Sequence, residues 1–145
     1  MSTMIWSQED QKLIAKFIIT EASINDEDVS ETAIESKEYL VFYTVEGENA
    51  TYLANYWVTS ERQTYGKVYD METNKYEETA DTYKREEFTF SWRYAYGDNP
   101  DKKYTAKVNL TKIYKKNGIT FVITIVDADL DVLVYKGFME GSFNY

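Results

Sequence analysis

Apolar and polar residues along most of the chain after residue 38 follow a pattern with a period of two, which is typical of strands. The segments 39–47, 51–60, 86–96, 103–114, 119–126 and 132–139 are predicted as strands, with polar or glycine-containing turns between them. Residues 66–78 predict a hairpin that turns at Thr73-Asn74, and Gly97 to Asp101 predict a turn. Asn117-Gly118, between two apolar runs, predicts a further hairpin.

The N-terminal third has a different pattern. Leu13, Ile14, Phe17 and Ile18 recur at helical spacing after Ser7, a good helix-capping residue. This spacing predicts an amphipathic helix over residues 8–19, and a strand over residues 13–20 is the alternative. The acidic stretch 25–38 predicts either a second, short helix or a solvated loop.

These elements predict one α+β domain over residues 1–145. Residues 1–37 would form an acidic helical segment, residues 38–139 an antiparallel meander of about six to eight strands, and residues 140–145 a loose tail. A meander of this length can also curl and close, which removes its unpaired edges. The alternative fold is therefore a closed barrel, lipocalin-like in architecture, although the Gly-x-Trp signature of that family is absent.

The strongest strand pattern is FTFSWRYAY, residues 88–96, where every second residue is aromatic. The rings belong to Phe88, Phe90, Trp92, Tyr94 and Tyr96. They would fill a core if they face inward, because large rings bury much apolar surface, or they could hold a flat ligand. We interpret them mainly as core, with the end at Trp92, Tyr94 and Tyr96 the most exposed part.

The composition excludes several kinds of site. The chain has neither cysteine nor histidine, so disulfides, thiolate or imidazole metal sites and histidine-based nucleophile pairs are impossible. The acidic pairs Glu77-Glu78 and Glu86-Glu87 are adjacent in predicted strands, so their side chains would diverge. We therefore expect no enzyme activity, no cofactor and no membrane segment, and the absence of a signal-peptide pattern predicts a cytoplasmic protein.

Charge is distributed unevenly along this chain of net charge −9. Residues 1–48 contain 11 acidic and 3 basic residues, whereas Lys102, Lys103, Lys107, Lys112, Lys115 and Lys116 lie close together later in the chain. The lysines are interpreted as a solvated face, since the overall acidity opposes direct binding of nucleic acid. Asp127, Asp129 and Asp131 do not follow the EF-hand spacing, and they are interpreted as a soluble turn with no metal.

The acidic residues in the first 48 positions predict what kind of partner the protein binds. We expect a surface made by eight acids to bind a protein with a basic surface, such as a nucleic-acid enzyme, by partial mimicry of phosphates; these acids are Asp26, Glu27, Asp28, Glu31, Glu35, Glu38, Glu46 and Glu48. The size and charge fit a phage-type inhibitor of the anti-CRISPR or anti-restriction kind. The alternative is a barrel that holds a small apolar or aromatic ligand on Phe88, Phe90 and Trp92, and the third possibility is a bacterial protein-interaction module.

Overall fold

The structure, a computed structural model, describes residues 11–76 and 84–140, and most of these residues lie in strands. The elements, in chain order, are β1 (Gln11–Ile24), β2 (Glu27–Asp28), α1 (Ser30–Glu35), β3 (Glu38–Val45), β4 (Thr51–Trp57), β5 (Arg62–Tyr76), β6 (Lys84–Tyr96), β7 (Asn99–Lys115), β8 (Gly118–Val126) and β9 (Val132–Met139).

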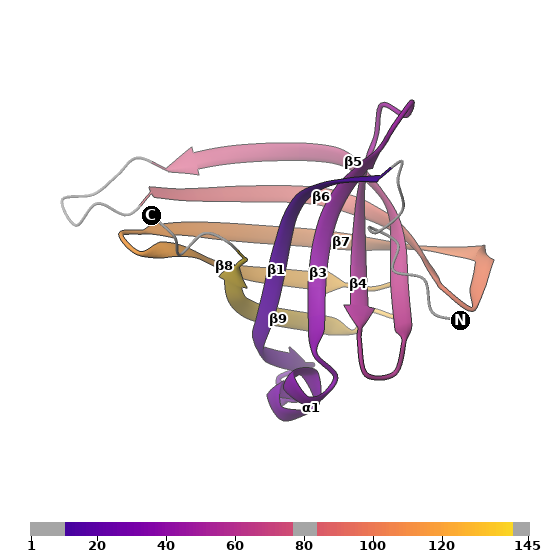
Figure 1. Cartoon of the computed structure of the whole chain (residues 1–145), viewed down its shortest axis with the longest axis horizontal. Coiled ribbons are helices and arrows are strands. Elements are labelled where there is room, and N and C mark those ends of the chain that lie inside the picture. Colours follow the sequence, from indigo (N-terminus) through magenta and orange to yellow (C-terminus); the bar gives the residue numbers. More distant parts are fainter. Residues whose placement is uncertain (1–10, 77–83, 141–145) are drawn as a thin grey trace.

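The eight long strands form a closed antiparallel barrel (Figure 1). Strands β1 and β3 to β9 are hydrogen-bonded in this order, and β9 pairs back with β1. The short strand β2 adds to the end of β1. The predicted α+β fold is therefore wrong, and the closed-barrel alternative is confirmed.

The first strand, β1, occupies the segment that predicted an amphipathic helix; residues 8–10 of that segment lie outside the described residues. Ala15, Phe17 and Ile19 alternate toward the barrel interior, and the next inward residue is Ala22, three positions later. Two register shifts, between Leu13 and Ala15 and between Ile19 and Glu21, interrupt the alternation. Because a bulge inserts one residue, it converts a spacing of two into a spacing of three, which resembles a helix.

The prediction for residues 25–38, a short helix or a solvated loop, is confirmed in part, because a short helix occupies Ser30–Glu35. Asn25 and Asp26 have φ values of 51° and 70°, and they form the two-residue turn between β1 and β2. Positive φ at both central residues is typical of the tight turns that connect hairpins. Only Ser30–Glu35 is helical, and Lys37, at φ 53°, ends this turn of helix. Within the described residues no helix is long and apolar enough to span a membrane.

The predicted strands after residue 38 correspond to β3, β4, β6, β7, β8 and β9. The predicted hairpin at Thr73-Asn74 is wrong, because both residues lie within β5 and pair with Phe88 and Glu87 of β6. The polar composition favours a turn locally, but pairing along a long ribbon overrides this preference. The turn at Gly97 is shorter than predicted, since β7 already begins at Asn99.

The barrel is built from two crossed groups of strands. Figure 1 shows β1, β3 and β4 running across the direction of β6 to β9, and β5 belongs to both groups. At the two corners the backbones approach closely: a Cβ on Gly66 would lie 1.7 Å from the Arg93 carbonyl oxygen, and one on Gly137 would lie 1.8 Å from that of Ile18. Glycine at these positions permits the sharp closure of the sheet.

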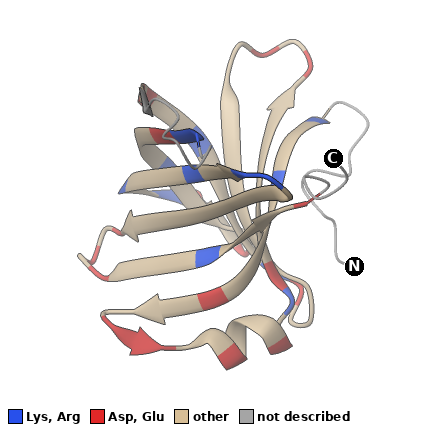
Figure 2. Cartoon of the chain, turned by 90° about the vertical axis from the view of Figure 1, so that its left-hand side faces the viewer, with Lys and Arg blue, Asp and Glu red and all other residues tan. Residues whose placement is uncertain are grey.

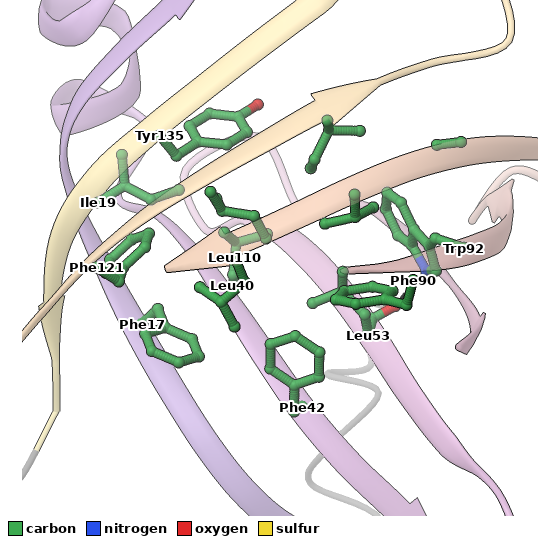
Figure 3. Packing of buried hydrophobic residues seen from close by; sticks show 14 of the residues in the cluster. Phe17, Ile19, Leu40, Phe42, Leu53, Phe90, Trp92, Leu110, Phe121 and Tyr135 are labelled. Atoms are coloured by element: carbon green, nitrogen blue, oxygen red, sulfur yellow. Dashed lines mark hydrogen bonds between the residues drawn. The ribbon is translucent and has the colours of Figure 1, made fainter. Parts of the chain in front are cut away.

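Inward side chains fill the interior between the two groups of strands (Figure 3). Phe17 lies 4.8 Å from Phe121 and 5.9 Å from Phe42, measured between ring centroids. Nε1 of Trp92 donates hydrogen bonds to the carbonyl oxygens of Leu53, at 3.1 Å, and Gly66, at 3.2 Å. A second buried cluster lies on the opposite face of β3 and β4 and contains Tyr39, Val41, Tyr43, Ala54 and Tyr56.

Candidate ligand pocket at the mouth of the barrel

One end of the barrel, which we call the mouth, holds an open pocket of about 240 Å³. The mouth lies opposite the end where α1 joins β1 to β3, which we call the α1 end (Figure 1). Most of the lining is apolar; the lining residues are Ile14, Ala15, Phe17, Phe42, Thr51, Met71, Phe88, Leu110 and Lys112. Concave, mainly apolar sites with a few polar groups are typical of small-molecule binding.

Two β-bulges place apolar side chains at the rim of this pocket. Ile14 lies at the register shift of β1, and Met71 lies at the shift between Tyr69 and Glu72 of β5. Asp70, beside Met71, has a φ of 54°. Ile14 is 52% exposed and Met71 is 44% exposed. Bulges redirect side chains, so here they produce an apolar rim that a bound molecule would cover.

Charged residues extend the inward faces of β6 and β7 at the mouth. Lys112 continues the inward series of Ala106, Val108 and Leu110, and Glu86 continues the series of Phe88 and Phe90. The two residues pair directly across the strands. Glu86 is buried and accepts a hydrogen bond from the Tyr114 hydroxyl. The apolar pocket therefore carries an amine at its edge.

The aromatic series of β6 is mostly core. Phe90, Trp92 and Tyr94 are buried, Phe88 lines the mouth pocket, and Tyr96 is 40% exposed. The expected exposure of Trp92 and Tyr94 is wrong, because the barrel closes over them and the β8–β9 turn lies beside Tyr94. Of the three rings predicted to hold a ligand, Phe88 lies at the pocket and Trp92 is occupied by its own hydrogen bonds.

At the α1 end the rings of this series contact one another. Tyr94 stacks on Trp92, with centroids 4.8 Å apart, and on Tyr104, at 5.5 Å. Tyr96 meets both Tyr94 and Tyr104 edge-on. Burial raises the pKa of Tyr94 to about 12, and the charges of nearby Asp127 and Asp129 contribute. These ring contacts stabilise the α1 end of the barrel.

The eight predicted acids do not form one surface. Asp26, Glu27, Asp28, Glu31 and Glu35 are on or next to β2 and α1, and we call this group the acidic end (Figure 2). Glu46 and Glu48 lie in the β3–β4 loop at the mouth. Because β3 has eight residues at about 3.3 Å each, the two groups are roughly 25 Å apart.

The eighth acid, Glu38, is buried inside the barrel. Its carboxylate accepts a hydrogen bond of 2.9 Å from Asn55, and it is also hydrogen-bonded to Tyr135 and Trp57. Burial raises the pKa of Glu38, although these hydrogen bonds oppose the shift. Burial likewise raises the pKa of Tyr135 well above its ordinary value. Glu38 is only 6% exposed, so it does not contribute to an outer surface.

The β8–β9 turn contains Asp127, Asp129 and Asp131, as predicted from the sequence. The carboxylate of Asp127 accepts hydrogen bonds from the backbone N–H groups of Asp129 and Asp131. Asp131 accepts a hydrogen bond from the Asn25 side chain. Their carboxylate oxygens lie within 4.8 Å of one another.

Several residues of the pocket were not singled out from the sequence. Lys112 was grouped with five other lysines, but it lies on the opposite face from Lys107, whose ammonium donates to Ser91. The signal was present in the alternation, since Lys112 is two residues after Leu110 and follows the apolar series. The alternation gave no such signal for Ile14 and Met71, because β-bulges direct these two side chains toward the pocket.

Comparisons of the chain with protein-family models, with curated proteins and with solved structures gave no match.

Proposed function

We propose that this protein binds a small apolar or aromatic ligand in the mouth pocket. The observation that carries this proposal is an apolar pocket of about 240 Å³ with two exposed apolar residues, Ile14 and Met71, at its rim. A ligand would remove both side chains from water, and burial of apolar surface is favourable by about 25 cal/mol per Å². Phe17, Phe42 and Phe88 supply ring surfaces for the ligand to contact.

A neutral single-ring probe, 4-phenylbutanol, followed by calorimetric titration, tests this proposal. We expect saturable binding at one site, and we expect Ile14→Glu and Met71→Glu to weaken it at least tenfold by introducing charge at the rim. Ile34→Glu is the matched control, because Ile34 is 56% exposed on α1 at the opposite end. Circular dichroism would verify that each variant folds. Probe binding that is absent, or that the rim variants leave unchanged, would overturn the proposal.

We propose, as a second candidate, that the acidic end contacts a basic protein surface. The supporting observation is that Glu27, Glu31 and Glu35 are exposed and form no ion pair with another described residue. Glu31 and Glu35 are one helical turn apart, a spacing that brings their side chains to the same face. Exposed charges without partners are available to steer an oppositely charged protein.

Charge reversal tests this second candidate. The triple variant Glu27→Lys, Glu31→Lys, Glu35→Lys should lose partners captured from a host lysate, and capture by the wild type should weaken as salt increases. The control triple variant reverses Glu46, Glu48 and Glu72, which changes the net charge equally but toward the mouth, away from the acidic end. Equal capture by the two triple variants would exclude the acidic end as a binding surface.

A further inference from the structure

The inward face of the sheet changes from apolar to charged where β6 and β7 pass the mouth. Leu110 pairs with Phe88, and the next inward pair along the two strands is Lys112 with Glu86. Both Phe88 and Lys112 line the mouth pocket. A molecule seated on the apolar wall would therefore meet the Lys112 side chain at its outer end.

Among the described residues, the Lys112 ammonium has ring neighbours but no hydrogen-bond acceptor. Nζ lies 5.4 Å from the centroid of the Phe88 ring and 5.6 Å from that of Tyr114. No carboxylate of a described residue lies within 4.0 Å of it. Cation–π contacts hold the amine in place electrostatically, but they leave its N–H groups available for a hydrogen-bond acceptor.

The carboxylate of Glu86, which pairs with Lys112 across the strands, does not act as this hydrogen-bond acceptor. Glu86 accepts its hydrogen bond from the Tyr114 hydroxyl, and it influences Lys112 through charge at longer range. Burial lowers the pKa of Lys112, and the charge of Glu86 opposes this effect. An amine that has lost part of its water without gaining an acceptor is suited to bind an anionic group, because charge-assisted hydrogen bonds are the strong ones.

Building on the proposed function, we propose that the ligand is a small amphipathic carboxylate whose anionic end binds the Lys112 ammonium while its apolar body fills the mouth pocket. The pocket volume of about 240 Å³ is below the roughly 300–1,000 Å³ of drug-sized sites, so the body is a short alkyl chain or a single ring. The apolar rim of Ile14 and Met71 covers the side of that body.

Calorimetric titration with matched acid and alcohol pairs tests this assignment. Octanoate and octanol represent an alkyl body, and 4-phenylbutyrate and 4-phenylbutanol represent an aromatic body. In at least one pair the wild type should bind the acid about tenfold more tightly than the alcohol. The pair with the greater affinity identifies the body of the ligand.

Two lysine variants complete the experiment. Lys112→Met retains the length of the side chain and removes the amine, so the preference for the acid should disappear while alcohol binding is retained. Lys107→Met, on the outer face of the same strand, should leave the preference unchanged. Equal binding of acid and alcohol by the wild type, or an acid preference that survives Lys112→Met, would overturn the assignment of an anionic ligand end to Lys112. Neither result would affect the proposed pocket. Failure of the acids and the alcohols to bind would overturn the proposed pocket itself.

Discussion

The side-chain nitrogen of Asn55 lies 2.9 Å from a carboxylate oxygen of Glu38, and both residues are buried inside the barrel. The same Asn55 nitrogen also donates to the Tyr39 carbonyl oxygen, at 3.2 Å. An acid that the sequence places in a solvated stretch is thus held between β3, β4 and β9, with Trp57 and Tyr135 as its further hydrogen-bond partners. A buried acid of this kind makes the stability of the fold depend on pH.

The free energy of unfolding should fall as the pH rises through the raised pKa of Glu38. Below its ordinary pKa, near 4.5, Glu38 is protonated in both the folded and the unfolded chain. At higher pH the unfolded chain releases the proton first, so the folded state loses stability until the buried group also ionises. Urea unfolding of the wild type and of Glu38→Gln, compared between about pH 4 and pH 8, measures this effect.

The Glu38→Gln variant should gain stability relative to the wild type as the pH increases, because glutamine does not ionise. Glu31→Gln removes the same charge from exposed α1 and serves as the control. Parallel pH curves for the wild type and Glu38→Gln would contradict the assignment of Glu38 as the buried titrating group.

Replacement of Trp92 by phenylalanine should destabilise the barrel by about 1–3 kcal/mol. The change leaves two buried carbonyl oxygens, those of Leu53 and Gly66, without the indole donor. Tyr96→Phe is the control, because Tyr96 is 40% exposed, and it should change stability by less than about 0.5 kcal/mol. Chemical denaturation measures both values, and equal stability of the two variants would contradict the role of these hydrogen bonds.

Gly66→Ala should cost more than about 3 kcal/mol, because the added methyl group would meet the backbone of Arg93 at 1.7 Å and a backbone cannot rotate away. Gly47→Ala provides a comparison in open space, where only the positive φ of 85° is unfavourable, at about 1–2 kcal/mol. Thermal and urea unfolding of the two variants should rank them in this order. The reverse order would show that the corner at Gly66 relaxes easily.

Phe17→Ala should lower the free energy of unfolding by about 3–5 kcal/mol, since Phe17 is 1% exposed and packs against Phe42 and Phe121. Phe17 also lines the mouth pocket, so the variant should bind a bulkier ligand than the wild type does. Unfolding experiments measure the first effect, and titration with acids of increasing length measures the second. A loss below about 1 kcal/mol would contradict a central role for Phe17.

The sequence predicts most strands correctly where the alternation is uninterrupted. In β6, the rings of Phe90, Trp92 and Tyr94 face inward as the period of two indicates. The prediction fails in β1 and β5, where bulges at Ile14 and Met71 shift the register. A bulge depends on how one strand pairs with its neighbour, so residues close in sequence carry little information about it.

The amino-acid sequence by itself determined the inward and outward faces of the regular strands, because alternation is a property of the local backbone. It also excluded cysteine and histidine chemistry outright. The tertiary structure alone decided that β9 pairs with β1, that Glu38 is enclosed, and that Lys112 stands at the edge of an apolar pocket. These features depend on contacts between residues far apart in the chain, and closure of the sheet is what creates an interior.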